Sequence, residues 1–411
     1  MYEKVLLWAT PVFLLLMAIE CTVAWLRRRS PYRLADAVTS VSLGALSTYV
    51  GVFTRLLTIG VYVVVYREAR LTTLDASSPW VWAAGLLLYD FLYYWNHRLG
   101  HEVNVLWSAH VVHHQSEEFN QSTALRQTGS GFLLSWVFYL PLALLGFPPA
   151  VYVALSLIDL LYQFWIHTEQ IGSLGVFDRV FASPSNHRVH HGVNDVYVDR
   201  NYGGILILWD RLFGTFQPEL PEQPVIYGTR DPLRSWNPLW ANLHTYAALG
   251  ADAWRARSWA DRLAVFWRRP GWRPADAALR APKLPFRLDA FRKYAPPLPR
   301  ALGVYCLAQG LVVIGFGAHF MSVAARWPLP AALGYLVALS ASLWIIGGLA
   351  EGRRAFVPLE LARLGVLALL GFVLLPGSAG SPAFVAALAA CGALALWLWR
   401  AARWLPRAAI A

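Results

Sequence analysis

Long runs of apolar residues with few charges dominate both ends of the chain. A helix needs about 20 residues to cross a hydrocarbon core roughly 30 Å thick. Runs of comparable length occur at residues 5–26, 36–66, 80–96, 301–324, 330–350, 356–375 and 382–400. The pattern predicts an all-α fold, a polytopic bundle of membrane helices. The first run contains Glu20 and is followed by arginines, so we interpret it as a span and not as a signal peptide.

Two further apolar stretches, 132–147 and 151–166, are separated by Gly146, Pro148 and Pro149. Proline and glycine break helices and favour a tight turn. We therefore expect a helical hairpin here, which either spans the bilayer or re-enters it from one side.

The segment 168–300 has a different character, since it holds most of the polar sequence and much of the proline. We expect it to form a helical cap on one side of the membrane. Within this segment, the stretch 254–267 carries Trp259, Leu263 and Trp267 at helical spacing, with arginines elsewhere. Such a helix either lies in the plane of the lipid headgroups or packs on the cap.

Composition agrees with a membrane protein, because 57% of the 411 residues are hydrophobic and only 14% are charged. The formal charge of +11 comes almost wholly from arginines at the ends of apolar runs. A nucleic-acid-binding protein would carry them on a soluble basic face, so we expect no nucleic-acid partner. Cys21, Cys306 and Cys391 each lie in an apolar run and predict neither a disulfide nor a thiolate metal site.

Arginines in short loops predict the orientation, because cytoplasmic loops are enriched in Lys and Arg. The basic segments are 27–33, 351–355 and the tail 400–407, whereas 376–382 is uncharged. With the basic loops inside, His97 and His167 both lie on the cytoplasmic side. Arg67 and Arg70 then lie on the far face, which is the one feature against this arrangement.

Eight of the eleven histidines fall into three short motifs. The motifs are H-R-L-G-H (His97, His101), H-V-V-H-H (His110, His113, His114) and H-R-V-H-H (His187, His190, His191). Spacings of three and four residues place each set on one face of a helix. Polar groups at membrane depth are costly and usually functional, so this clustering predicts a metal site.

Eight imidazoles exceed what one ion can hold, so we predict two adjacent metal ions, each served by such helical faces. His167, at the end of the hairpin, is either a ninth ligand or a helix cap. A histidine-rich metal pair beside a lipid pocket favours iron, which can activate O₂ for attack on an unreactive C–H bond. Zinc can replace iron in a purified sample, because zinc(II) generally binds more tightly.

Metal-bound histidines usually donate their second N–H to an oxygen, so we expect carboxylates near the site. Asp90 precedes His97 by seven residues on nearly the same helical face, and Glu102 follows His101 directly. We predict functional roles for these two carboxylates. His244 and His319 have no partners in sequence and are interpreted as structural.

The three motifs resemble the histidine boxes of the fatty acid hydroxylase and sterol desaturase superfamily of membrane di-iron enzymes. Further stretches are similar to its alkylglycerol monooxygenase branch. They are H-R-L-G-H-E-V-N-V-L-W at 97–107, N-Q-S-T-A-L-R-Q at 120–127, L-Y-Q-F-W-I-H-T-E at 161–169 and N-P-L-W-A-N at 237–242. The similarity extends over about 35–275, and the helices that follow also look like that branch. We therefore divide the chain into a catalytic region, 1–300, and a C-terminal four-helix membrane region, 301–411.

The resemblance implies a monooxygenase that hydroxylates the ether-linked carbon of a glyceryl ether lipid and releases a fatty aldehyde and a glycerol product. It also implies that the eight box histidines bind two iron ions, that Glu102 is functional, and that O₂ is a substrate. The electron donor would be tetrahydrobiopterin, or a redox protein as in other branches. Asn186 stands where we expect the branch to have a histidine, which leaves the choice of substrate or donor open.

Other functions remain open at this stage. The same chemistry could act on a sterol, a fatty acid or a sphingoid base, and histidine-rich membrane proteins also include metal transporters and non-redox metal-binding proteins. A transporter would need ligands at several depths, whereas every motif here maps to one side. The arginine-rich, lysine-poor composition favours a bacterial inner membrane over the endoplasmic reticulum.

Overall fold

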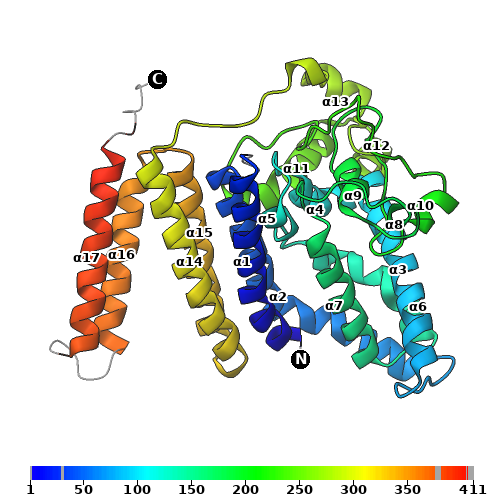
Figure 1. The fold of residues 1–411 in the computed structure, drawn as a ribbon, viewed down its shortest axis with the longest axis horizontal. Coiled ribbons are helices and arrows are strands. Elements are labelled where there is room, and N and C mark those ends of the chain that lie inside the picture. The colour runs from blue at the N-terminus through cyan, green and yellow to red at the C-terminus, as the bar shows by residue number, and fades with distance from the viewer. Residues whose placement is uncertain (1, 29–31, 375–380, 404, 406–411) are drawn as a thin grey trace.

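The computed structural model describes residues 2–28, 32–374, 381–403 and 405, and this part of the chain is almost entirely helical (Figure 1). Its β-type pairings are two isolated bridges, between Phe181 and Leu206 and between Gly192 and Tyr227. The all-α prediction is therefore confirmed.

Five helices of the described part are long and apolar enough to cross a membrane, by length and composition. They are α1 (Tyr2–Leu26), α2 (Leu34–Ala69), α14 (Arg300–Val323, continued by the short helix η4, Ala324–Arg326), α15 (Leu329–Ala350) and α17 (Pro382–Ala402). A further apolar helix, α16 (Phe356–Leu374), packs beside α17. The chain is a multi-pass membrane protein, as the apolar runs predicted.

The expected crossing at 80–96 and the first histidine motif belong to one continuous helix, α3 (Pro79–Glu102). Pro79 occupies the first turn, where its missing N–H breaks no helical hydrogen bond. Helix α3 packs against α7 (Pro149–Trp165), and the first histidine motif lies at the end of α3 that follows its apolar part.

The first half of the predicted hairpin is not a single helix. Residues 132–147 form the short helices η1 (Gly131–Leu133), η2 (Ser135–Tyr139) and α6 (Leu140–Leu144). Pro141 lacks a backbone N–H and fits only the first turn of a helix, so it lies in the first turn of α6 and cannot continue η2. The predicted turn is present, with Gly146 at a φ of 87°, a conformation that favours glycine.

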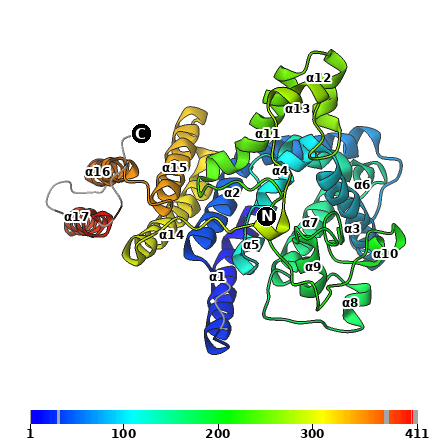
Figure 2. The ribbon, with the colours of Figure 1, turned by 90° about the horizontal axis from the view of Figure 1, so that it is seen from above.

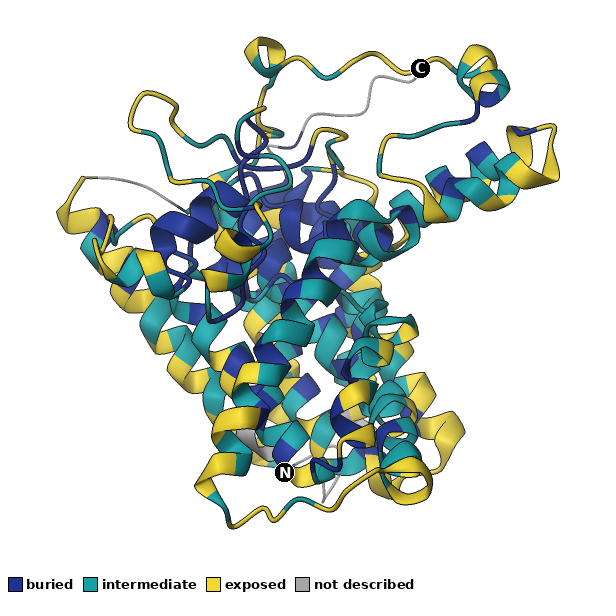
Figure 3. Cartoon of the chain, turned by 90° about the vertical axis from the view of Figure 1, so that its right-hand side faces the viewer, coloured by how far each residue is buried: buried dark blue, intermediate teal, exposed yellow. Residues whose placement is uncertain are grey.

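The polar cap lies above the long helices in Figure 1. Its elements are α4 (Asn104–His114), α5 (Gln121–Ala124), α8 (Phe177–Val180), α9 (Pro184–His190), α10 (Leu208–Leu212), α11 (Pro238–Arg255), α12 (Trp259–Trp267), α13 (Ala275–Arg280) and η3 (Leu288–Ala290). Figure 3 shows buried residues gathered at this end, whereas exposed residues follow the outer faces of the long helices. Apolar outer faces of this kind are typical of helices that contact lipid.

The single helix expected over 254–267 is interrupted. Helix α11 ends at Arg255, and α12 begins after Ser258, whose hydroxyl accepts a hydrogen bond from the Asp261 amide at 3.0 Å. Trp259 and Trp267 are exposed, while Val265 is fully buried. Helix α12 therefore packs on the cap through one face and presents tryptophans on the other.

The basic loops lie at the cap end of the bundle. Arg33 pairs with Glu118, directly after the second histidine motif, at 2.9 Å. The loop 351–355 reaches the cap through Glu351, which accepts a hydrogen bond from the Ser235 hydroxyl at 2.5 Å. The histidines and these basic loops thus share one end, as predicted. Parts of the orientation argument, at 29–31, 376–380, 404 and 406–407, lie outside the described residues.

Of the C-terminal helices, α14 and α15 pack against α2. Figure 2 shows α16 and α17 at one edge, α14 and α15 next, and α2 between them and the α3–α7 side. Gly317 of α14 lies against the Tyr49 ring of α2, where any Cβ would overlap the tyrosine hydroxyl. This close approach brings α14 up to the catalytic region.

Candidate metal centre

Nine histidines from four parts of the chain converge inside the cap. His97 and His101 lie at the end of α3, and the second motif forms the end of α4. The third motif forms the end of α9, with His191 as the residue directly after it. His167 follows α7 by two residues. Helix α9 begins after Ser183 because the Ser183 side chain caps it and Pro184 occupies its first turn.

The nine imidazoles form two groups, within each of which the candidate ligand atoms lie within 4.8 Å of one another. The five-histidine cluster contains His97, His101, His110, His114 and His190, and the four-histidine cluster contains His113, His167, His187 and His191. Two clusters agree with the prediction of two metal ions.

The second and third motifs each divide their histidines between the two clusters. Residues four apart share a cluster, as in the pairs His110/His114 and His187/His191. The remaining histidine of each of these two motifs, His113 or His190, belongs to the other cluster. The second and third motifs therefore link the two clusters.

Backbone carbonyls fix the orientation of four rings. The Nδ1 atoms of His97 and His190 donate to the carbonyls of Tyr202 and Arg200, at 2.8 and 3.0 Å. His113 Nδ1 donates to the Arg126 carbonyl at 3.0 Å. His167 Nδ1 donates to the Gln163 carbonyl at 2.7 Å. A carbonyl can only accept, so Nδ1 carries the proton and Nε2 offers a lone pair in each neutral ring.

These lone pairs point at one another. His113 Nε2 and His167 Nε2 are 3.1 Å apart, and His167 Nε2 is 3.0 Å from His187 Nε2. His113 and His167 cannot hydrogen bond through these atoms, because both have already placed their proton on Nδ1. Converging lone pairs of neutral imidazoles are what a bound transition-metal ion requires, so the donor set fits iron or zinc.

Burial keeps the rings neutral. Removal from water lowers the pKa of His97 to about 3 and that of His113 to about 4. Burial also lowers the pKa of His110, His114 and His191 well below the ordinary value, and neighbouring histidines lower it further. At neutral pH every one of these rings is therefore ready to bind a metal ion.

The two predicted carboxylates do not contact the histidines directly. Asp90 accepts hydrogen bonds from the amides of Ile205 and Leu206, at 2.8 and 3.0 Å, and from the Trp209 indole at 2.9 Å. It thereby holds the segment that follows Tyr202, the carbonyl partner of His97. Backbone carbonyls thus accept the Nδ1 hydrogen bonds that we expected carboxylates to accept.

Glu102 lies between two arginines. Its carboxylate pairs with Arg98 at 3.1 Å and with Arg269 at 3.2 Å. The glutamate ties the end of α3 to the residues after α12. The carboxylate found near His101 is instead Asp199, whose Oδ1 lies 3.8 Å from His101 Nδ1.

Sequence reasoning missed the turn 199–202 that supports two of the ligands. Asp199 and Asn201 have φ values of 58° and 57°, the left-handed conformation that Asp and Asn tolerate better than most residues. The Asn201 side chain donates to the carbonyls of Asn186 and Gln217, at 3.0 and 2.8 Å. The Asp and Asn of D-R-N at 199–201, which tolerate the left-handed conformation, are the sequence feature that could have indicated this turn.

A second missed element is the buried guanidinium of Arg126. It donates to the Val112 carbonyl at 3.0 Å and to the Ser40 hydroxyl at 3.1 Å, and lies 3.6 Å from the Asp36 carboxylate. The pair joins α2 to the second histidine motif. Arg126 lies within the motif N-Q-S-T-A-L-R-Q, so its position was visible in the sequence but its role was not.

Asn186 and the two isolated histidines lie outside the clusters. The Asn186 amide donates to the carbonyls of Asp178 and Phe181, both at 3.1 Å, and so braces the start of α9. His244 contacts Gln115 and the Ala241 carbonyl, and His319 lies near the Tyr335 hydroxyl. These contacts agree with the structural interpretation of both histidines.

Comparison with known proteins matches residues 82–215 to the fatty acid hydroxylase family. The chain is 39% identical over 310 residues to alkylglycerol monooxygenase of Homo sapiens, covering 75% of this chain and 69% of the human protein. It is 41% identical over 272 residues to the Danio rerio protein of that name, covering 66% of this chain and 60% of the fish protein. Ornithine lipid hydroxylase OlsE of Rhizobium tropici is 31% identical over 137 residues, which is 32% of this chain and 40% of that protein.

No solved structure matches the chain. The matched family segment contains all nine histidines of the two clusters. This chain therefore belongs to the fatty acid hydroxylase family, within its alkylglycerol monooxygenase branch.

Proposed function

We propose that this oxidoreductase is an O₂-dependent di-iron monooxygenase that hydroxylates the ether-linked carbon of glyceryl ether lipids. The observation that carries the proposal is the convergence of imidazole lone pairs in two neighbouring clusters, at the end of an apolar helix bundle. Its curated relatives named alkylglycerol monooxygenase support the choice of substrate.

The balanced reaction is RCH₂–O–R′ + O₂ + 2e⁻ + 2H⁺ → RCH(OH)–O–R′ + H₂O. The hemiacetal then breaks its C–O bond to R′ and yields an aldehyde, RCHO, and an alcohol, R′OH. Two iron ions bound by the clusters would supply the O₂ activation that protein side chains cannot perform. Tetrahydrobiopterin or a redox protein supplies the two electrons.

The chain itself contributes orientation and exclusion of water. Carbonyls at Tyr202, Arg200, Arg126 and Gln163 hold four rings with Nε2 directed inward. Asp90 and Glu102 act as positioning residues, because they hold the segments next to His97 and His101 and touch neither ring. Burial of the nine rings keeps bulk water away from the reacting centre.

We place the clusters on the cytoplasmic side of a bacterial inner membrane. The cap end carries Arg33 and the loop 351–355, and short basic loops favour the cytoplasm.

The test is turnover of a 1-O-alkylglycerol by the purified, iron-loaded protein with tetrahydrobiopterin under ¹⁸O₂. The expected product is a fatty aldehyde that carries ¹⁸O, trapped at once as the alcohol with borohydride so that exchange with water is avoided. A zinc-loaded sample is the matched control and should be inactive. Oxidation of a sterol or fatty acid with no glyceryl ether turnover would contradict the proposed substrate, and full activity with zinc alone would contradict the redox chemistry.

A further inference from the structure

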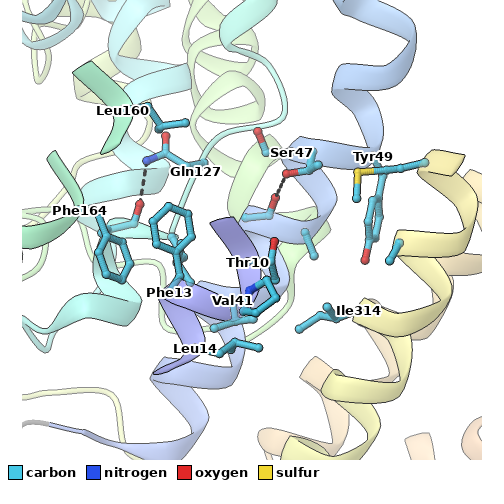
Figure 4. Close-up of a pocket in the computed structure, with 18 of the residues that line it drawn as sticks. Thr10, Phe13, Leu14, Val41, Ser47, Tyr49, Gln127, Leu160, Phe164 and Ile314 are labelled. Atoms are coloured by element: carbon cyan, nitrogen blue, oxygen red, sulfur yellow. Dashed lines mark hydrogen bonds between the residues drawn. The ribbon is translucent and has the colours of Figure 1, made fainter. Parts of the chain in front are cut away.

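Two cavities of similar size meet beside the four-histidine cluster. The first, about 420 Å³, lies between α1, α2, α5, α7 and α14 (Figure 4). His167 forms part of its wall. The second, about 400 Å³, is lined from α3, α4, α7 and the η1–η2 segment, and includes His97, His110 and His113. Gln127, Leu160 and Gln163 line both cavities, so the cavities adjoin at these side chains.

The two cavities differ in polarity. The first is lined mainly by apolar side chains such as Phe13, Leu14, Val41 and Ile314, which surround it in Figure 4. Serines and other hydrogen-bonding groups line the second, among them Asn96, Ser130, Ser135, Ser156 and Tyr246. An apolar cavity suits a hydrocarbon chain, and a cavity with several polar groups suits a hydroxylated headgroup.

The change in polarity falls next to the metal ligands. His113 lines the polar cavity, His167 lines the apolar cavity, and their Nε2 atoms are 3.1 Å apart. In a 1-O-alkylglycerol the ether-linked carbon of the chain is where hydrocarbon meets polar headgroup. A lipid lying across both cavities would therefore bring this carbon to the four-histidine cluster.

We propose that the apolar cavity binds the alkyl chain of the glyceryl ether and the polar cavity binds its glycerol group, so that this match of polarity selects the carbon that is oxidised. This inference rests on the proposed function, because it assumes a glyceryl ether substrate. The position of the bound lipid relative to the reacting centre then determines which of its C–H bonds is attacked.

Asp159 is a buried carboxyl group in the wall of the polar cavity. Its side chain is 4% exposed, and its Oδ2 accepts a hydrogen bond from Gln163 Nε2 at 2.8 Å. Tyr93 donates to Gln163 Oε1 at 2.8 Å and so fixes that amide. Asp159 Oδ1 has no hydrogen-bond partner among the described residues. A buried acceptor without a partner is costly, and a glycerol hydroxyl would satisfy it.

Helix α14 closes the far side of the apolar cavity. Ile314, Ala318 and Met321 belong to this wall, and all three lie outside the segment matched by the family. The C-terminal region therefore sets the length of chain that fits. A bulky residue at Ala318 would shorten the cavity without touching any histidine.

The test of the chain site compares Ala318→Phe with the control Leu311→Phe, whose leucine lies on the same helix, is 49% exposed and is absent from the wall. Binding of 1-O-decylglycerol and 1-O-octadecylglycerol to the iron-loaded protein is measured without reductant, so that no turnover occurs. Ala318→Phe should weaken binding of the octadecyl compound about tenfold, equivalent to about 1.4 kcal/mol, and leave the decyl compound nearly unchanged. Leu311→Phe should change neither. Equal effects on both chain lengths, or no effect on either, would overturn the assignment.

The test of the headgroup site compares Asp159→Leu with Asp159→Asn. A 1-O-alkylglycerol and an alkyl methyl ether of equal chain length serve as probes, since the second compound lacks both hydroxyls. Asp159→Leu should weaken binding of the glycerol compound only, and Asp159→Asn, which keeps a group able to hydrogen bond to a hydroxyl, should restore part of it. An equal loss for both probes would contradict hydroxyl recognition. Chain-length-dependent binding without aldehyde formation would instead leave the cavities assigned and refute the proposed function.

Discussion

His113 Nε2 and His167 Nε2 lie 3.1 Å apart, although 54 positions separate the two residues in the chain. Each ring donates its Nδ1 proton to a backbone carbonyl, so neither can donate to the other. Two opposed lone pairs at this distance repel unless a cation lies between or beside them. The structure thereby places His167 in the four-histidine cluster, while its Nδ1 also caps the last turn of α7 through the Gln163 carbonyl.

Replacement of His167 by alanine should therefore remove one metal ion and leave the other. We expect the metal content to fall from about two to about one ion per chain, with loss of turnover, because only the four-histidine cluster loses a ligand. Metal analysis of the purified variant checks this. His244→Ala, outside both clusters, is the control and should retain both ions. An unchanged metal content in His167→Ala would contradict the assignment.

Replacement of Asp36 by asparagine should destabilise the fold. The change leaves the buried Arg126 guanidinium without its charge partner at 3.6 Å, and breaking a buried pair in this way typically costs about 3–5 kcal/mol. A lower thermal unfolding midpoint in detergent is the expected readout. Asp231→Asn breaks only the exposed pair with Lys283 and should shift the midpoint little. Similar midpoints for the two variants would show that the buried pair is not needed.

Stability of the metal-free protein should fall as the pH decreases from about 6.5. Burial lowers the pKa of His97 to about 3 and of His113 to about 4, whereas an unfolded chain titrates its histidines near 6.5. Between these values the unfolded chain binds more protons, so protons favour unfolding, and above about 6.5 the histidines contribute no pH dependence. Thermal unfolding midpoints measured from about pH 8 to pH 5 test this. A midpoint that stays constant below about pH 6.5 would be inconsistent with neutral, buried rings.

Asp90→Asn should affect the five-histidine cluster selectively. The asparagine cannot accept from both the 205–206 amides and the Trp209 indole as the carboxylate does, so the turn that positions the Tyr202 carbonyl should loosen. We expect about 10- to 100-fold weaker binding of one of the two ions, as for other residues that orient metal ligands. Competitive metal titration separates this effect from a general loss of structure, which would weaken the binding of both ions equally.

Glu102→Gln should weaken metal binding much less than Asp90→Asn does. Its partners Arg98 and Arg269 are charged groups outside the clusters, so the loss of these ion pairs should lower stability by about 1 kcal/mol or less. Metal titration and unfolding of the variant provide the check. Loss of turnover with intact metal binding would indicate that Glu102 acts on the substrate directly, contrary to its positioning role.

The sequence by itself determined the long apolar helices and the grouping of the histidines on helical faces. Apolar runs of membrane length predicted the long helices, because a chain in lipid must satisfy its backbone hydrogen bonds internally. Histidines at helical spacing predicted a pair of metal sites, because spacing along one helix fixes which side chains share a face. The motifs around them indicated the family.

Only the tertiary structure decided how the ligands are divided and supported. Spacing within α4 and α9 does not reveal that His113 and His190 each join the other cluster, because this depends on how the helices cross. The carbonyl partners at Arg126 and Tyr202 likewise depend on backbone paths far apart in sequence. The first cavity lies between α1, α2, α7 and α14 and the second between α3, α4 and α7, since helix packing, and not local sequence preference, decides where space remains beside the histidines.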